Sequence, residues 1–589
     1  MPTKASLEPL LLSILASRME SAVRDMANTL LRSARSTVIN TARDFSCSIL
    51  TADGDLLFAT DALPVHVIGS DLLARSILDL HPDVAEGDAF LHNDPYLGNS
   101  HPADHALLVP VFCDGRHLFT VCAKAHQADC GNALPTTYSP WPADVYEEGA
   151  LIFPCIRVQR NFSDRDDVIR MCRSRIRVPE QWYGDYLAAV GSARVGERRL
   201  LELVAEYGAE TIAGFVGAWL DYSERRMSDA IAELPSVRVS GATVHDPVPA
   251  MDDGIALGVT VESDPDLAQI SVDLRDNPDN YPGGLNESRA CATAAAIAGV
   301  FNVIGPDVPL NAGSFRRIKV LLRQGCVAGI PTFPHSCSSA TTDVFERIIG
   351  MTQMALAQLG DGYGLAEGAY GQAPHKAVIS GLDPRRGNAP FVNQIFIGAA
   401  GGPGGPGCDG WPTYQRSSSA GLMFHDSVEV DEQRYPIRVE ERSLIPDSGG
   451  AGRHRGGLGG HVVIRAEGAA IDFIYVLDGQ ANPPRGVCGG RDGGQAAAAR
   501  IDLDGRRHPL PGVAQVTLAP GERMESWSNG GGGYGDPLAR DPVEVLNDVL
   551  EGWVSAVAVR DSYGVVIVDG RLDEDATRRL RAARATRVH

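Results

Sequence analysis

The sequence predicts a mixed α+β protein of several domains, and three observations lead to this prediction. The chain has 589 residues, more than one hydrophobic core usually serves. Residues 6–43 carry apolar side chains at helical spacing, whereas the segments that follow alternate short apolar runs with turn signals. From residue 381 onwards, glycine is frequent between short apolar segments such as "HVVIRA" and "IDFIYVL".

These features predict three domains. Residues 1–235 should form an N-terminal domain with a long helix, antiparallel strands around a metal site and a helical segment. Residues 236–380 should form a mixed α/β domain, because strand-like runs there precede the apolar helix "ACATAAAIAGVFNVI". Residues 381–589 should form a glycine-rich, strand-rich C-terminal domain in which many glycines have positive φ.

Within the first domain the order of elements can be predicted from turn and periodicity signals. A single helix is expected over residues 6–43, which contain no Gly and, after Pro9, no Pro. Asp53-Gly54 and Asp114-Gly115 each favour a tight hairpin between two strands. Residues 164–234 return to helical spacing and should contain one or two amphipathic helices.

Composition excludes several classes of function. A formal net charge of -21 opposes binding to nucleic acid or to an anionic membrane. The apolar patch at residues 10–16 is too short to span a bilayer and has no cleavage site after it, which favours a cytosolic protein. The eleven cysteines include no C-x-x-C pair, so neither a disulfide framework nor a cysteine zinc site is expected.

Histidines and aspartates gather at the ends of the second predicted hairpin. His101 and Asp104 lie in "NSHPADH" just before one strand, and His126 follows the other in "AKAHQADCG". Antiparallel pairing would bring these ends together, and imidazole with carboxylate suits zinc or manganese. Asp44, where the first helix gives way to a strand, is a further candidate ligand. Loop side chains that only hydrogen-bond would give the same pattern, so both interpretations stay open.

Three residues next to the candidate ligands are expected to have other roles. Adjacent side chains of an extended chain point to opposite faces, so His105 should pack behind the site rather than bind the metal. Asp129 is close enough to His126 in sequence to act as a proton acceptor or to support a ligand. Cys130 is interpreted as a small buried side chain rather than as a nucleophile.

The motifs "GDAFLHNDPYLGNSHPADHALLVPVF", "HQADCGN", "EEGALIFP", "PLNAGSFRRIKV", "DSGGAGRHRGGLGG" and "NGGGGYGDPLARDP" occur in this order along the chain. In this respect the sequence resembles the hydantoinase B/5-oxoprolinase family. That family includes B-type subunits of ATP-dependent hydantoinases and lactamases, and subunits of acetone and acetophenone carboxylases. The resemblance implies a metal held by His101, Asp104 and His126, with Asp44 as a fourth ligand.

Two departures from the family pattern lie beside these residues. Asn99 and Ser100 stand where the family usually has glycine and threonine, and Asn132 replaces the second glycine of a pair. Both leave the ligand positions intact but reshape their surroundings. The substrate of one relative therefore cannot be transferred to this chain.

The resemblance also implies a partner. The glycine runs lack the G-x-x-x-x-G-K-[ST] pattern of a phosphate loop, and in this family ATP is bound by a separate A-type subunit. In the favoured interpretation that subunit phosphorylates a cyclic amide, and metal-activated water attacks it here. In the alternative, the same metal stabilises an enolate in an ATP-dependent ketone carboxylase. A non-catalytic scaffold subunit is the third interpretation.

Overall fold

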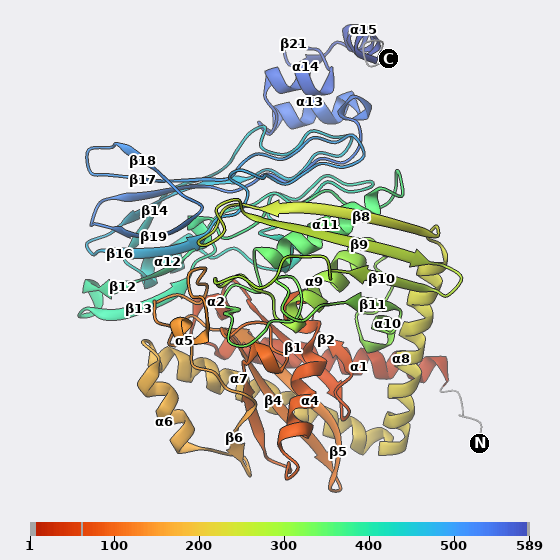
Figure 1. The fold of residues 1–589 in the computed structure, drawn as a ribbon, viewed down its shortest axis with the longest axis vertical. Helices are drawn as coiled ribbons and strands as arrows, with labels where there is room; N and C mark the ends of the chain where they lie inside the picture. Colours follow the sequence, from red (N-terminus) through yellow and green to blue (C-terminus); the bar gives the residue numbers. More distant parts are fainter. Residues whose placement is uncertain (1–7, 61–62, 586–589) are drawn as a thin grey trace.

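A computed structural model describes residues 8–60 and 63–585 of the chain. Its lower part in Figure 1 is built on a seven-stranded antiparallel sheet flanked by helices. In spatial order the strands are β2 (Leu56–Ala59), β1 (Phe45–Thr51), β5 (Arg116–His126), β4 (Asp104–Cys113), β3 (Ala89–His92), β6 (Ile156–Arg160) and β7 (Ser163–Asp164). The helices of this part are α1 (Pro9–Ser33), α2 (Thr37–Asn40), α3 (Pro64–Val67), α4 (Ser70–Leu80), α5 (Val145–Glu148), α6 (Asp166–Arg175), α7 (Pro179–Tyr207) and α8 (Ala209–Ala232).

The central strand β4 is buried on both faces of this sheet, which explains its unbroken apolar sequence. Leu107 and Val109 belong to the main hydrophobic core, whereas Ala106 and Leu108 pack into a separate cluster with α4. This alternation follows from the two-residue period of a strand. Helix α7 covers the main-core side of β4 and β5, and α1 packs on α7.

The long helix predicted over residues 6–43 ends earlier, at Ser33. The backbone N–H groups of Arg35 and Ser36 donate hydrogen bonds to Oδ1 of the buried Asp185 in α7. The Asp185 carboxylate therefore accepts hydrogen bonds from the backbone N–H groups that would otherwise continue the helix. Local periodicity cannot reveal such a partner. The predicted helical segment at 164–234 is divided into three helices, and Gly208, with φ of 83°, separates α7 from α8.

A second sheet and three helices form the middle of the molecule. Its strands are β11 (Ile318–Leu321), β10 (Gln269–Asp273), β9 (Ile255–Asp264) and β8 (Val237–His245), with helices α9 (Arg289–Phe301), α10 (Ala312–Phe315) and α11 (Val344–Ala357). Helix α11 packs on β8, β9 and α9. Between named strands of the described chain, only β10 and β11 pair in parallel. The main hydrophobic core runs through this part and the lower part without interruption.

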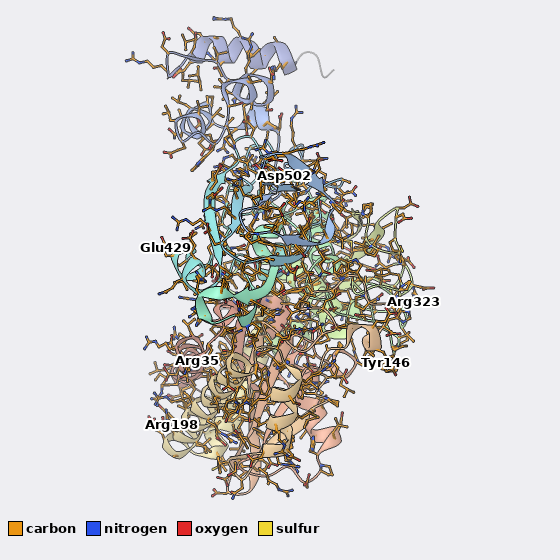
Figure 2. The ribbon with its side chains drawn as sticks, turned by 90° about the vertical axis from the view of Figure 1, so that its left-hand side faces the viewer. Arg35, Tyr146, Arg198, Arg323, Glu429 and Asp502 are labelled. Carbon is orange, nitrogen blue, oxygen red and sulfur yellow. The ribbon has the colours of Figure 1, made fainter. Side chains whose placement is uncertain are left out.

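The C-terminal part is rich in strands, as predicted. One sheet contains β13 (Ala389–Gln394), β12 (Val378–Asp383), β16 (Ile471–Val476) and β19 (Val513–Leu518). The other contains β14 (Ile437–Leu444), β15 (Gly460–Ala466), β20 (Arg523–Trp527), β17 (Ala497–Ile501) and β18 (Arg507–Leu510), with α12 (Val428–Arg434) nearby. The two sheets enclose their own hydrophobic core. In the side view, Arg198 lies in the lower helical part and Asp502 in this upper part (Figure 2).

A small helical unit ends the described chain at the top of Figure 1. It comprises α13 (Pro542–Leu550), α14 (Ala556–Tyr563), β21 (Ile567–Val568), β22 (Arg571–Leu572) and α15 (Glu574–Ala585). Short 3-10 helices elsewhere are η1 (Pro95–Leu97), η2 (Pro374–Lys376), η3 (Pro384–Arg386), η4 (Ser417–Ser419) and η5 (Pro537–Ala539). In residues 8–60 and 63–585, no helix is long and apolar enough to cross a membrane. The division into three domains, with boundaries near residues 235 and 380, stays a prediction.

The glycine runs of the C-terminal part pack against one another as extended segments. Twelve glycines of the described part of 381–589 have positive φ, as predicted, but no glycine of the runs 449–460 and 530–533 does. Glycine is required in these two runs because neighbouring backbone segments approach one another closely. A Cβ atom on Gly531 would lie 1.9 Å from the Gly402 carbonyl oxygen, and the Gly531 N–H donates to Gly457. Any larger residue would force these segments apart.

Candidate metal centre

The predicted hairpin between β4 and β5 is confirmed and brings two candidate ligands together. Asp104 begins β4, His126 ends β5, and the two residues are direct register partners. Asp114 and Gly115, with φ of 50° and 73°, make the two-residue turn at the far end. The aspartate and the histidine are therefore held by paired strands, which is a rigid position for ligands.

The turn before β4 places His101 beside Asp104. The Asp104 N–H donates to the His101 carbonyl at 3.2 Å, which closes a four-residue turn. Asn99 donates from Nδ2 to the carbonyls of His101 and Asp104, each at 2.8 Å. Ser100 donates from Oγ to Asp104 Oδ2. Asn99 and Ser100, two of the positions that depart from the family pattern, thus hold the turn and one of the candidate ligands in place.

Three donor atoms from these elements converge on one buried point. His101 Nε2 lies 3.0 Å from Asp104 Oδ1 and 3.3 Å from His126 Nδ1, and the third separation, His126 Nδ1 to Asp104 Oδ1, is 3.2 Å. All three side chains are buried. In the described part of the chain, these are the residues whose ligand atoms are grouped closely enough to hold a metal ion.

The outer atoms of both imidazoles are fixed by hydrogen bonds. The carbonyl of Ser338 lies 2.7 Å from His101 Nδ1, and a carbonyl only accepts, so Nδ1–H donates. The neutral ring then keeps its Nε2 lone pair for the centre of the group. His126 Nε2 bonds to the Thr137 hydroxyl at 2.9 Å, and the ring of Tyr138 stacks on His126 with centroids 4.9 Å apart. Such outer contacts orient ligands in metal sites.

The electrostatics of the group favour a charged Asp104 carboxylate beside a neutral His126 ring. Burial opposes ionisation of Asp104, but the neighbouring His101 and His66 outweigh it and hold its pKa well below the usual range. Burial also lowers the pKa of His126, although Asp104 and Asp44 oppose this effect. Both directions suit metal binding, because a metal requires deprotonated ligands.

Asp44 lies next to the three converging residues, with His66 between it and Asp104. His66 Nε2 is 3.5 Å from Asp44 Oδ1 and 3.2 Å from Asp104 Oδ2. Asp44 Oδ2 is buried and has no hydrogen-bond partner. The backbone carbonyl of Asp44 accepts from the His126 N–H at 3.0 Å. The predicted fourth ligand is therefore close to the group but is not part of it, and its role as a ligand stays a prediction.

His66 was not among the residues predicted from the sequence. It lies in α3 within the apolar stretch "LPVHVIG", just after the β1–β2 hairpin, and its side chain is buried. A lone histidine in an apolar helix is the single signal that the sequence offers, and such a residue usually belongs to the core. Tyr138 and Ser338 were also missed, because a stacked ring and a backbone carbonyl leave no pattern of their own.

Asp129 does not point a free oxygen at the converging residues. Its Oδ1 accepts from the Gly131 N–H and from Arg177 Nη1, both at 3.1 Å, and its Oδ2 accepts from the Arg177 N–H. The carboxylate thus ties the segment after β5 to the start of α7. These contacts favour a structural role, and the catalytic role of Asp129 stays a prediction.

His105 faces away from the centre, as expected from strand geometry. The Trp182 indole donates to its Nδ1 at 3.3 Å, and the ring of Phe153 packs edge-on against it. Burial lowers the pKa of His105 to about 3, so the ring is neutral. Cys130 is buried as well, and burial raises the pKa of its thiol well above the usual value, which leaves it a poor nucleophile.

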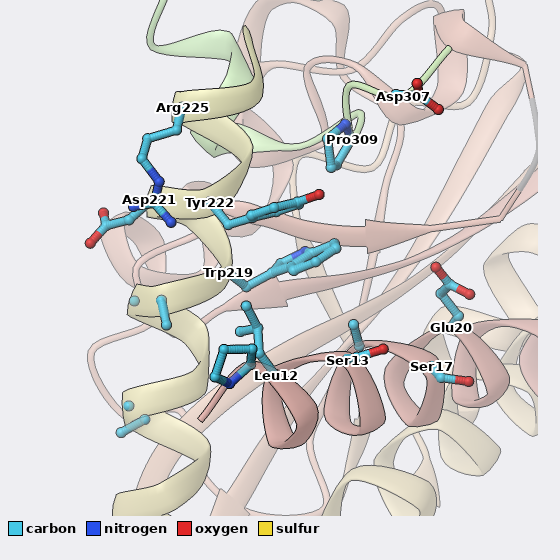
Figure 3. Close-up of a pocket in the computed structure, with 16 residues that line it drawn as sticks. Leu12, Ser13, Ser17, Glu20, Trp219, Asp221, Tyr222, Arg225, Asp307 and Pro309 are labelled. Atoms are coloured by element: carbon cyan, nitrogen blue, oxygen red, sulfur yellow. The ribbon is translucent and has the colours of Figure 1, made fainter. Parts of the chain in front are cut away.

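A prominent surface cavity lies away from the converging residues. It has a volume of about 1200 Å³ and opens between α1 and α8, where Ser13, Trp219 and Tyr222 line it (Figure 3). None of the converging residues contributes to it. We therefore place the candidate site by its chemistry rather than by the size of the cavity.

Comparison with known proteins agrees with the motifs. A family model described as hydantoinase B/oxoprolinase matches residues 8–537. The chain belongs to this family. It is 30% identical to the caprolactamase subunit beta of Pseudomonas jessenii, over 98% of this chain and 100% of that protein. The resemblance that the motifs indicated is thereby confirmed.

Two solved structures share the hydantoinase B/oxoprolinase fold. The ATP-dependent caprolactamase from Pseudomonas jessenii superposes with a TM-score of 0.85 at 28% identity, covering 98% of this chain and 100% of that one. A nucleotide-free acetone carboxylase superposes with a TM-score of 0.86 at 18% identity, covering 99% and 83%. At that identity the second similarity shows the fold alone.

Proposed function

We propose that this chain is the B-type catalytic subunit of an ATP-dependent cyclic-amide hydrolase of the hydantoinase, oxoprolinase or lactamase type. The observation that supports this most directly is the buried convergence of His101, Asp104 and His126 in a chain of this family. The 30% identity with a caprolactamase subunit favours hydrolysis over carboxylation. The substrate would be a cyclic amide that a partner subunit has phosphorylated.

The donor set fits a divalent transition metal. Two imidazole nitrogens and one carboxylate oxygen suit zinc or manganese, and Asp44, with its unpartnered Oδ2, is a candidate for the next ligand. A metal held there would lower the pKa of water and polarise an amide carbonyl.

The protein supplies orientation and exclusion of water. The Ser338 carbonyl fixes the tautomer of His101. The Thr137 hydroxyl bonds to the ring of His126 and holds it in position. Asp104 is buried and charged, with Lys124 Nζ 3.9 Å from its Oδ2. A dry site strengthens the electrostatic interactions within it.

ATP would be bound by a partner A-type subunit. The glycine runs of this chain lack the phosphate-loop pattern, and in the described structure many of them pack against one another instead of forming an open loop. The relative named caprolactamase subunit beta is itself one subunit of an enzyme. Purified alone, this chain should not hydrolyse ATP.

One experiment separates the candidate functions. The chain is purified, its metal content is measured, and it is then combined with a co-expressed A-type subunit, ATP and a panel of lactams and hydantoins. We expect stoichiometric zinc or manganese and ATP-dependent ring opening. Incorporation of labelled bicarbonate into a ketone, without ring opening, would identify a carboxylase. A chain that binds no metal and supports neither reaction would be a scaffold, contrary to the proposal.

A further inference from the structure

Arg416 lies buried beside the candidate metal centre with unused hydrogen-bond donors. It is 2% exposed, and its Nε and Nη1 atoms have no hydrogen-bond partner. The two nearest carboxylates are beyond hydrogen-bond distance: Nη2 is 4.0 Å from Asp44 Oδ2, and Nε is 3.9 Å from Glu346 Oε1. A buried guanidinium with unsatisfied donors is costly, so such a group indicates a ligand that supplies acceptors.

A single aromatic ring separates this guanidinium from the converging histidines. The ring of Tyr138 stacks on His126 and on His101, with centroids 4.9 and 5.3 Å apart. The guanidinium carbon of Arg416 lies 5.9 Å from the Tyr138 centroid. Arg416 is thus close enough to hold one end of a small molecule whose other end reaches the candidate ligands.

Two further buried polar groups lie near Arg416, one beside it in the sequence and one whose charge interacts with it. Ser417, at the start of η4, has a buried hydroxyl with no partner. Lys376 in η2 is buried, and its Nζ donates to the carbonyl of Gln415. Burial and the charge of Arg416 lower the pKa of Lys376, while burial raises that of Glu346. A bound anion would favour the protonated form of Lys376 and would accept hydrogen bonds from the free donors of Arg416.

We propose that Arg416, Ser417 and Lys376 bind the phosphoryl group of the activated substrate. This assignment rests on the proposed function, because a phosphorylated cyclic amide is the substrate that it requires. A guanidinium fork, an ammonium group and a hydroxyl together supply many donors, which suits a phosphoryl dianion with three acceptor oxygens better than a carboxylate with two. Asp44, next to Arg416, would then lie at the reacting end of the same molecule.

The test is phosphate binding to the full-length chain after its metal has been removed, so that phosphate cannot act as a metal ligand. Calorimetric titration with inorganic phosphate is carried to equilibrium, with acetate and bicarbonate in parallel. We expect phosphate to bind and the two planar anions to bind more weakly. Arg416→Gln should weaken phosphate binding at least tenfold, and Arg416→Lys should fall between this variant and the wild type.

Matched controls separate recognition from general charge and folding effects. Arg198→Gln removes the same charge from a side chain that is 63% exposed on α7, and it should leave phosphate binding unchanged. Ser417→Ala should weaken binding severalfold without loss of thermal stability. Ser263→Ala removes another buried, unpartnered hydroxyl from β9 and should have no effect on phosphate. If the arginine variants fail to fold, the two serine variants still decide the question.

Three outcomes would overturn the assignment: no phosphate binding at millimolar concentrations, wild-type binding by folded Arg416 and Ser417 variants, or tighter binding of the planar anions. Failure of the proposed function gives a different result. In that case phosphate binding would depend on Arg416, yet the complex with its A-type subunit would open no cyclic amide. If the complex opens a cyclic amide but phosphate binding does not depend on Arg416, this inference is wrong and the proposed function is still supported.

Discussion

Asp104 and His126 face each other across the first register pair of the β4–β5 hairpin, with Oδ1 and Nδ1 3.2 Å apart. The hydrogen bonds of the ladder fix this separation, so the pair does not depend on a flexible loop. His101 joins it through a four-residue turn closed by the Asp104 N–H. The candidate metal centre is therefore built at the ends of two central strands of a buried sheet.

His101→Ala or His126→Ala should remove most of the bound metal. Each change deletes one of three converging donor atoms, and we expect at least a tenfold loss of affinity, about 1.4 kcal/mol or more. Metal content after dialysis, measured by mass spectrometry, provides the result. His105→Gln is the matched control, because that ring faces Trp182, and it should keep the metal. Full metal retention in either alanine variant would show that the assignment is wrong.

His66→Gln should weaken metal binding by about tenfold, the lower end of what the loss of an orienting partner usually costs. His66 Nε2 lies between Asp44 and Asp104, so its removal frees both carboxylates to change orientation. Asp44→Asn should have a smaller effect than Asp104→Asn, because an amide oxygen can still coordinate and Asp44 lies outside the closest group. Competition with a chelator measures all three affinities. Unchanged affinity in His66→Gln would limit that residue to a packing role.

The sequence was sufficient to predict most of the candidate centre. The two hairpins, the pairing of Asp104 with His126 and the outward position of His105 all follow from local rules of turns and strands. Those rules describe neighbours along the chain or across one hairpin. Of the site residues named from the sequence, the structure brings His101, Asp104 and His126 together, whereas Asp44 and Asp129 lie outside that group.

Contacts between distant segments could not be predicted in this way. Asp185, which binds the backbone at the end of α1, belongs to another helix and lies 150 residues along the chain from Arg35. Arg416 reaches the centre from the C-terminal part, and Ser338 fixes His101 through a backbone carbonyl that carries no side-chain signal. The close packing of the glycine runs could not be predicted either, because their partners lie in distant segments. In each case the information lies in the tertiary fold.

Gly531→Ala should destabilise the C-terminal part strongly. Its Cβ would lie 1.9 Å from the Gly402 carbonyl oxygen, where only backbone could move. We expect a loss of about 3 kcal/mol, the upper range of overpacking effects, measured by chemical denaturation. Gly305→Ala, where a Cβ would meet no atom within 4 Å, is the control and should be close to neutral. Equal stability of the two variants would contradict the close packing of the glycine runs.

His245 should make stability depend on pH between about 6.5 and 9. Burial alone would lower its pKa, but Asp478 and Asp343 outweigh burial and the opposing charge of Arg347, and they raise the pKa to about 9. Its Nε2 lies 3.3 Å from Asp343 Oδ1 and 3.7 Å from Asp478 Oδ2. A raised pKa means that the protonated form stabilises the fold. This contribution is complete below pH 6.5 and is lost as the pH rises through 9.

The size of the effect follows from the shift. At 1.36 kcal/mol per unit, the stabilisation lost across this range is roughly 3 kcal/mol. Denaturant titrations at several pH values should therefore show a difference in unfolding free energy between wild type and His245→Gln that is about 3 kcal/mol larger below pH 6.5 than above pH 9. His508→Gln, which alters a surface pair whose ring is 37% exposed, should show almost no such change. A difference between wild type and His245→Gln that stays constant with pH would mean that His245 is neutral in the folded protein.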